Sequence, residues 1–136
     1  MLTNPGYAAR VRDLVQHQTQ DQLDRRDLDL LKWGRHFRID HNMKVIVGRD
    51  QRDNEAMERL VRPVDVVLKA ELYPGPLVVI PQAPAEADLT MAAALCASYS
   101  DAPPGEMVAV LVAGRAGETV RISRREPREI FQELLL

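Results

Sequence analysis

The stretch KVIVGRDQRDNEAMERL, from Lys44 to Leu60, places a glycine and an arginine between an extended segment and a helical pattern. The first turn of a helix leaves backbone N–H groups unpaired and directs them outward, where they can bind an anion. Gly48 would allow a close approach of the ligand, and Arg49 would add a guanidinium beside it. The same residues can also form a simple tight turn, so the pattern predicts either a turn or an anion site.

Other cationic residues flank this corner. Arg52 and Arg59 share one face of the expected helix with Arg49 near its start, along a line that a phosphate backbone could follow. Arg35 and Arg38 lie on one expected strand, where alternation points them to opposite faces unless the strand bulges. The residues that we expect to bind RNA phosphates are Arg35, Arg38, Lys44, Gly48, Arg49, Arg52 and Lys69, with Asn54 as polar support.

Some of these side chains have a plain structural alternative. The spacings Glu55–Arg59 and Glu58–Arg62 are i,i+4 pairs in the favourable order, so we expect solvated ion pairs there. Arg49 has no such helical partner, which favours a functional role for it. Asn54 is expected to bond a neighbouring backbone group, because an unpaired buried amide would be costly.

The aromatic and nucleophilic residues carry weaker signals. Trp33 and Phe37 could stack on unpaired bases, but we expect Phe37 to pack in the core, while Trp33 is open to either role. His36 is expected to be hydrogen-bonded or exposed. Cys96 is expected to be a small buried hydrophobe, with a sulfur-carrier role as the weaker alternative. The sequence shows no metal-ligand spacing, no catalytic constellation and no cofactor motif, so we expect no cofactor.

The whole chain has the composition of one globular domain. Its 136 residues can bury a core without disulfides, and no apolar run approaches the length of a membrane span. We therefore expect no membrane partner, and the single cysteine fits a reducing cytoplasm. The net charge of −2 argues against a strongly basic nucleic-acid binder. Residues 70–114, however, contain no Lys or Arg, which is compatible with one basic and one acidic face and also arises by chance.

The first thirty residues differ from the rest. We expect a short helix from Tyr7 to His17, a polar linker from Gln16 to Gln22, and a second helix that includes Leu23 and Leu30. Residues 1–29 would form a helical arm or linker to an N-terminal domain, and residues 30–136 a single domain.

From Leu31 onward the pattern indicates strands and helices in the order ββαββαββα. The expected strands are 35–39, 44–48, 65–68, 77–81, 107–112 and 119–123, and the expected helices are 50–63, 88–99 and 127–135. The strand 107–112 is apolar on both faces and belongs in the middle of a sheet, and the next strand should point Val120 and Ile122 inward. This order predicts an α+β fold with a mixed, largely antiparallel, hairpin-rich sheet covered by helices.

These residues resemble the NFACT-R family, an RNA-binding domain of ribosome-quality-control proteins. The resemblance spans roughly residues 30–123 and is carried by GRHFRID, KVIVGRDQRDNEAMERL, DVVLKAELYPGPLVVI and DLTMAAALCASYSDA. Its most specific parts are Gly48-Arg49 followed by Asn54, then Asp65, Gly75-Pro76, and an alanine-rich helix that ends in serine.

One departure from the family pattern concerns residues 65–69. The quality-control branch carries Asp-Leu-Trp-X-His where this chain has DVVLK, so Lys69 would keep a phosphate contact while stacking at Val67 is lost. The difference favours a bacterial branch in which the domain follows a PP-loop domain like that of tRNA 2-thiouridylase and ThiI. The opening LTNPGYAARVRDL is similar to the segment after such a domain, which would make this chain part of a longer protein.

The resemblance implies an accessory domain that presents RNA, with tRNA expected, to a catalytic domain. The single cysteine and the lack of catalytic motifs add the expectation that it is cytoplasmic and has no catalytic activity of its own. Its partner would be a PP-loop catalytic domain in cis or in trans. The alternative is a protein-interaction module that docks on a PP-loop enzyme or the ribosome and touches no RNA. The negative net charge and the acidic middle of the chain favour that alternative.

Overall fold

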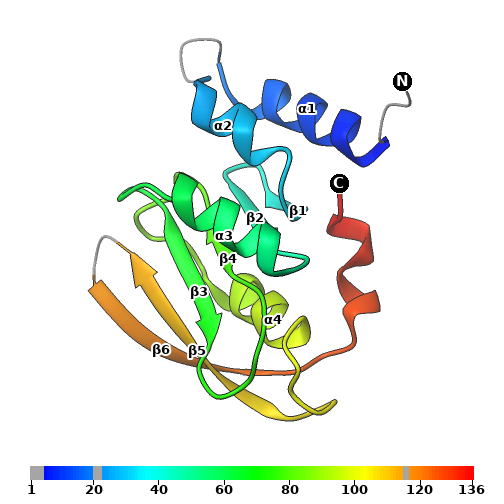
Figure 1. The fold of residues 1–136 in the computed structure, drawn as a ribbon, viewed down its shortest axis with the longest axis vertical. Helices are drawn as coiled ribbons and strands as arrows, with labels where there is room; N and C mark the ends of the chain where they lie inside the picture. Colours follow the sequence, from blue (N-terminus) through cyan, green and yellow to red (C-terminus); the bar gives the residue numbers. More distant parts are fainter. Residues whose placement is uncertain (1–4, 20–22, 115–116) are drawn as a thin grey trace.

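The computed structural model describes residues 5–19, 23–114 and 117–136. Within these residues six strands form one sheet in the order β1-β2-β4-β3-β5-β6 (Figure 1). The strands are β1 (Arg35–Asp40), β2 (Met43–Val47), β3 (Val66–Ala70), β4 (Val78–Ile80), β5 (Met107–Gly114) and β6 (Gly117–Arg124). The helices are α1 (Pro5–His17), α2 (Arg25–Leu30), α3 (Gln51–Leu60), α4 (Thr90–Ser98) and the 3₁₀-helix η1 (Arg128–Leu134).

The α+β class and the hairpin-rich sheet are confirmed. The strand pairs in the described part of the chain are antiparallel throughout rather than mixed. Asp50 caps α3 as expected, because its side chain accepts a hydrogen bond from the backbone N–H of Asp53 at 2.8 Å. The last part of the expected linker, residues 20–22, is outside the described residues. None of the described helices is long and apolar enough to cross a membrane.

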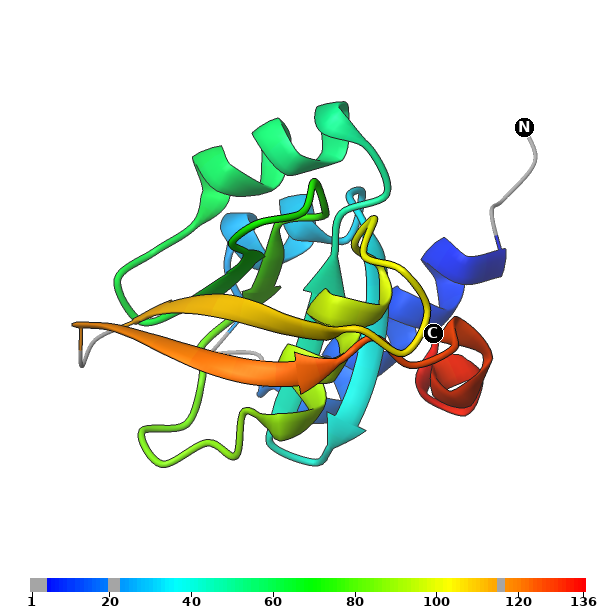
Figure 2. The ribbon, with the colours of Figure 1, turned by 90° about the horizontal axis from the view of Figure 1, so that it is seen from below.

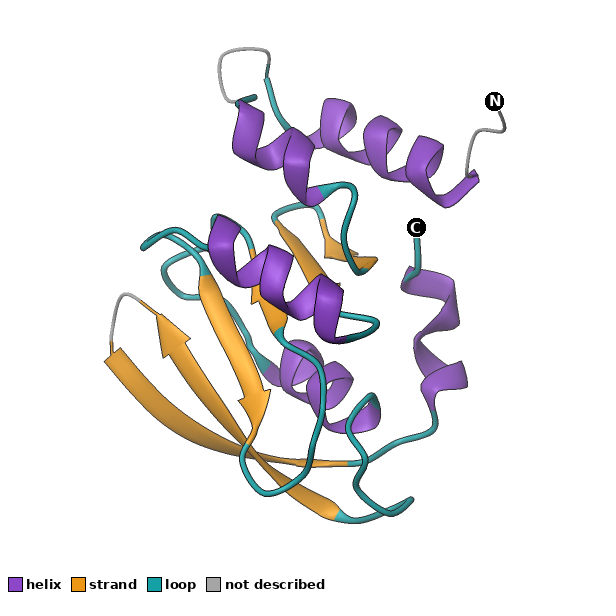
Figure 3. Ribbon diagram, viewed as in Figure 1, coloured by secondary structure: helices purple, strands orange, loops and turns teal. Residues whose placement is uncertain are grey.

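Helices cover both faces of the central strands (Figure 3). On one face, α4 and η1 pack over a core that includes Val45, Leu68, Val110 and Phe131. On the other face, α2 and α3 pack over a smaller cluster built around Ile46. Because both of its faces are covered, β2 is buried along its whole length.

The β5–β6 hairpin departs from the prediction (Figure 2). β5 has strand neighbours on both sides, but only one of its faces is buried, and Leu111 on the other face is 41% exposed. β6 forms the edge of the sheet, where Val120 and Ile122 are 55% and 63% exposed. The expectation that Val120 and Ile122 point inward is therefore wrong, because the core lies under the opposite face of this hairpin.

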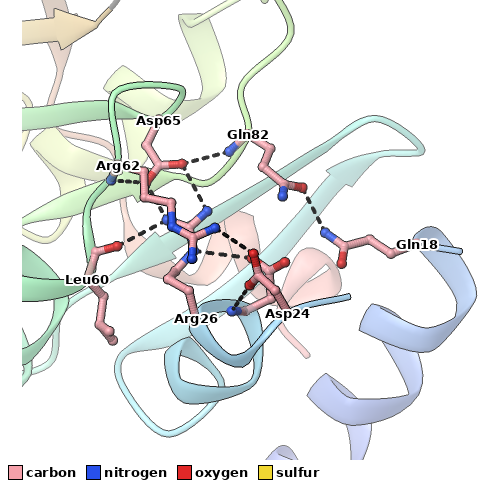
Figure 4. Close-up of polar contacts among 8 residues, drawn as sticks. Gln18, Asp24, Arg26, Leu60, Arg62, Asp65 and Gln82 are labelled. Atoms are coloured by element: carbon pink, nitrogen blue, oxygen red, sulfur yellow. Dashed lines mark hydrogen bonds and ion pairs between the residues drawn. The ribbon is translucent and has the colours of Figure 1, made fainter. Parts of the chain in front are cut away.

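A buried ion pair joins α2 to the sheet (Figure 4). Nη1 of Arg26 lies 2.5 Å from Oδ2 of Asp65, and both side chains are almost fully buried. The same guanidinium donates to the carbonyl of Leu60 at 3.1 Å. The Asp65 carboxylate also accepts from the backbone N–H groups of Arg62 at 2.8 Å and Gln82 at 2.9 Å. One carboxylate thus holds α2, the end of α3 and the loop after β4 together.

Helix α1 is also tied to the domain. Arg10 donates to the carbonyl of Leu31 at 2.8 Å, and Nε of Arg38 on β1 donates to Asp13 at 2.9 Å. Gln18, just beyond α1, donates to the side chain of Gln82 at 2.8 Å (Figure 4). The expected N-terminal helices are present, and in this structure both pack against the sheet domain.

His36 is buried beneath α2. Its Nε2 lies 3.1 Å from the carbonyl of Leu30 and 3.0 Å from that of Trp33, so Nε2 must carry the proton. Nδ1 has no hydrogen-bond partner among the residues that the structure describes. Burial, with Lys44 and Arg10 nearby, lowers the pKa of His36 well below its ordinary value.

We predict that Arg26→Met destabilises the protein by about 3–5 kcal/mol, because it leaves the buried Asp65 carboxylate without its counterion. Urea denaturation gives the free energy of unfolding. The matched control is Arg62→Met, which breaks the half-exposed pair with Asp24 and should cost much less, because solvent screens that pair. Equal costs for the two variants would contradict the assignment of Asp65 as the anchor.

We also predict that stability falls as the pH drops below about 6.5, where the unfolded chain protonates His36 and the folded chain does not. The folded pKa is the lower one, so the unfolded state binds the extra proton and gains stability in acid. The melting temperature of His36→Gln should depend less on pH between pH 7 and pH 5.5 than that of the unmodified protein. An unchanged pH dependence in His36→Gln would contradict this assignment.

Candidate nucleic-acid interface

The predicted phosphate-binding residues lie in four separate places. Arg35, Gly48, Arg49 and Asn54 line one pocket, which we call the Tyr99 pocket. Arg38 and Lys44 line a second pocket, which we call the Lys44 pocket. The guanidinium of Arg52 lies over the ring of Trp33, 5.7 Å from its centroid, and Lys69 is exposed on β3. The opposite orientations of Arg35 and Arg38 are confirmed, so the seven residues do not form one patch.

The Tyr99 pocket has a volume of about 300 Å³. It lies where the start of β1, the turn between β2 and α3, the loop before β4, the C-terminal end of α4 and the start of η1 meet. Its lining residues are Arg35, Gly48, Arg49, Asp50, Gln51, Asn54, Gly75, Pro76, Tyr99, Asp101 and Arg128. Of the most specific residues of the family resemblance, Gly48-Arg49, Asn54 and Gly75-Pro76 converge on this pocket, whereas Asp65 forms the buried ion pair with Arg26.

Two arginines stack on the ring of Tyr99. The guanidinium carbon of Arg128 lies 4.7 Å from the ring centroid, and that of Arg35 lies 5.1 Å from it. The ring is positioned from behind by Phe37, which meets it edge-on with the centroids 6.0 Å apart. Among the described residues neither arginine has a carboxylate within ion-pair distance. Nε of Arg128 donates to the carbonyl of Ser98 at 3.3 Å, so its terminal N–H groups are the ones left to bind phosphate.

Arg49 differs from the expectation. Its Nε lies 2.7 Å from Oδ2 of Asp53, and its backbone N–H donates to the same oxygen at 2.9 Å. The hydrogen bond to Asp53 raises the pKa of Arg49. The view that Arg49 lacks a helical partner is therefore wrong, because Asp53 stands four residues later. The N–H groups of Arg49 and Asp53 are both occupied by carboxylates, so these two donors are not open to an anion.

Gly48 and Asn54 form one structural unit. Oδ1 of Asn54 accepts the backbone N–H of Leu77 at 3.0 Å, which confirms the expected backbone bond. The N–H of Gly48 donates to the carbonyl of Leu77 at 2.9 Å. A Cβ on Gly48 would lie 1.9 Å from Oδ1 of Asn54. The glycine is therefore required by the asparagine that joins α3 to β4, whether or not a ligand approaches.

The Lys44 pocket combines charges of both signs. Lys44 is 6% exposed, and burial lowers its pKa to about 8, with Arg38 and Arg10 acting in the same direction. The carboxylates of Asp13 and Asp27 oppose that shift, and Asp13 is already paired with Arg38. These acids balance the cations, so the pocket is a weaker phosphate site than its two basic residues suggested.

The structure also tests the expectations for Arg62, Phe37 and Cys96. Arg62 pairs with Asp24 on the N-terminal segment at 2.5 Å, whereas we expected it to pair with Glu58. Phe37 is 1% exposed and belongs to the core as expected. Cys96 is fully buried, and burial raises the pKa of its thiol to about 12, which argues against a sulfur-carrier role. No group of His, Cys, Asp and Glu in the described residues is arranged to hold a metal ion.

Two residues of the Tyr99 pocket escaped the sequence reasoning. Arg128 lies 29 residues after Tyr99 and 93 after Arg35, and no local pattern connects the three positions. Tyr99 itself follows the alanine-rich helix within the motif ASYSDA, which the family resemblance included. That motif was the one signal that could have identified Tyr99 as part of a site.

Comparisons with known proteins identify a family and a similar fold. The family model described as NFACT protein RNA binding domain matches residues 34–133. The C-terminal part of the fibronectin/fibrinogen-binding protein from Streptococcus suis has a similar solved structure, with a TM-score of 0.62 and 17% sequence identity. The match covers 98% of this chain and 63% of that one, so the shared fold includes the N-terminal helices. No curated protein matches the chain significantly.

We predict that the effects of Gly48→Ala and Asn54→Ala are not additive. Asn54→Ala should cost about 1–3 kcal/mol because the Leu77 N–H loses its acceptor. Gly48→Ala should add little in that background, because the atom it would meet is gone. Urea denaturation of both single variants and the double variant measures the coupling. Additive costs would show that Gly48 is required for a reason other than Asn54.

Proposed function

Because this chain belongs to the family of NFACT protein RNA binding domains, we propose that it binds RNA through the Tyr99 pocket. The observation that supports this location is the pair of guanidinium groups, Arg35 and Arg128, that stack on Tyr99 without ion-pair partners in the described structure. Arg49 contributes a third cation at the rim, although its pair with Asp53 weakens its attraction for phosphate.

The chemistry of the pocket suits a phosphate backbone. Arg35 and Arg128 present fixed planar guanidinium groups, which can bind phosphate oxygens with two hydrogen bonds each. Stacking fixes the two side chains before the ligand arrives, so binding immobilises fewer rotamers. The acidic residues Asp50 and Asp101 also line the pocket and limit its net charge. The pocket therefore fits a short stretch of backbone better than an extended duplex.

The finer assignment rests on the sequence resemblance. We propose that the RNA is tRNA, and that the domain presents it to a PP-loop catalytic domain in cis or in trans during a thiolation or related modification. The domain itself would be non-catalytic and cytoplasmic. Two observations support a domain that binds RNA and leaves catalysis to its partner. The pocket residues offer cations and an aromatic ring, and the one cysteine is buried.

We predict that Arg35→Ala and Arg128→Ala each weaken tRNA binding about tenfold or more, because each removes a charge-assisted hydrogen bond to phosphate. Each variant should also reduce the slope of log affinity against log salt by about one. A gel-shift titration at several salt concentrations measures both effects, and the melting temperature tests whether each variant is folded.

The matched control is Arg25→Ala, which removes an equally charged but 86% exposed arginine on α2. It should leave tRNA affinity unchanged. If all three variants bind tRNA equally well, the pocket is not the RNA site. Binding weaker than about 10⁻⁴ M that is insensitive to salt would favour a protein-interaction module instead. A comparison of tRNA with unstructured RNA of equal length tests the tRNA assignment separately.

A further inference from the structure

The two edges of the sheet differ in whether another segment of the chain covers them. The β1 edge is covered by the end of the chain, because Leu135 bridges to Phe37 and the N–H of Leu136 donates to the carbonyl of His36 at 2.8 Å. The β6 edge carries no such bridge within the described residues. An uncovered edge strand offers a row of unpaired N–H and C=O groups to another strand. At eight residues, β6 is one of the two longest strands in the described sheet and has no proline to blunt this edge (Figure 1).

The hydrogen bonds just beyond the end of β6 show which of its backbone N–H and C=O groups point toward β5. Arg125 donates to the carbonyl of Glu106 at 2.7 Å and accepts from the N–H of Gly105 at 3.0 Å, so its backbone groups point toward β5. Backbone groups alternate in direction along an antiparallel strand. Those that point away from β5 therefore belong to Glu118, Val120, Ile122 and Arg124.

The same four residues place their side chains on the open face of the sheet. They stand opposite Ala113, Leu111, Ala109 and Met107 of β5. Met107 and Leu111 are 50% and 41% exposed, so this face presents an apolar strip that ends at the free edge. The strip contains no aromatic ring on which a base could stack, so its chemistry suits a protein partner rather than RNA.

We propose that a second copy of this chain pairs with the β6 edge, with the two β6 strands antiparallel about a two-fold axis at Arg121. In this register Val120 stands opposite the second copy's Ile122, and Glu118 stands opposite the second copy's Arg124. All four outward-pointing residues then exchange backbone hydrogen bonds with the partner strand. The dimer joins the two apolar strips into one continuous surface and places two opposite-charge pairs at its ends.

The register follows from the side chains. A shift of two residues in one direction pairs Glu118 with an isoleucine, and a shift in the other direction pairs Val120 with an arginine. Only the proposed register matches both the apolar and the charged positions. It also places Thr119 opposite the second copy's Ser123 on the other face. The one unfavourable contact in this register is between Arg121 and Arg121 of the second copy, which meet at the two-fold axis. Nη2 of Arg121 donates to Oγ1 of Thr90 on α4 at 3.4 Å, so the guanidinium is directed away from that axis.

The proposal is tested by sedimentation equilibrium of the full chain. We expect concentration-dependent dimerisation of the transient class, because one strand edge buries less surface than a permanent interface. Glu118→Arg and Arg124→Glu should each weaken the dimer at least tenfold, because each places like charges opposite one another. The double variant should restore the affinity by reversing both pairs. A variant that merely damages the fold would not be rescued in this way.

A second variant tests the backbone pairing. Ile122→Pro removes an N–H that points to solvent and leaves the β5 ladder intact, so it should abolish dimerisation without lowering the melting temperature sharply. The matched control Glu129→Arg changes an exposed charge on η1 and should leave the dimer unchanged. A chain that stays monomeric up to about 1 mM overturns the proposal. A dimer that is insensitive to every β6 substitution also overturns it.

Discussion

The fold depends most directly on the buried carboxylate of Asp65. It accepts hydrogen bonds from Arg26 on α2, from the backbone after α3 and from the backbone after β4. A buried carboxylate must have its charge and lone pairs satisfied, so these three segments have one favourable arrangement around it. Helix α2 is therefore anchored to the sheet by an interaction whose loss leaves an unpaired charge in the interior.

The same constraint positions the candidate RNA site. Helix α3 is held near its C-terminal end by Asp65, through the N–H of Arg62, and near its N-terminal end by Asn54, through the N–H of Leu77. Between these two points the helix has little freedom to slide against β4. The turn that carries Arg49 is consequently fixed against the loop containing Gly75, which itself packs on Ser100 after α4. The pocket walls come from segments that are distant in the chain and share these anchors.

Pairing with carboxylates determines which arginines of this protein can attract a polyanion. Most arginines near the sheet meet a carboxylate: Arg26 meets Asp65, Arg38 meets Asp13, Arg49 meets Asp53 and Arg62 meets Asp24. Paired cations contribute little attraction for a polyanion beyond their immediate surroundings. Arg35 and Arg128 stack on the Tyr99 ring instead, and Arg128 also donates to the neutral carbonyl of Ser98, so no carboxylate offsets their charge. A chain with a net charge of −2 can therefore still present a local cationic site.

The sequence by itself determined the features that depend on residues a few positions apart. It determined the hairpin of β1 and β2, the Asp50 cap of α3, the core position of Phe37 and the backbone bond of Asn54, because turns, caps and alternation are local. The pair of Arg49 with Asp53 is local as well, because the two residues are four positions apart. The predicted i,i+4 ion pairs included only those between glutamate and arginine.

Only the tertiary structure decided which distant residues meet and which faces are covered. Arg128 reaches Tyr99 because the segment between β6 and η1 is hydrogen-bonded to Ser98 at the end of α4, and no local pattern encodes that contact. Val120 and Ile122 alternate like buried residues, yet β6 lies at an edge whose apolar side faces away from α4. Alternation specifies that a strand has two different faces, whereas strand order and helix placement specify which of them water reaches.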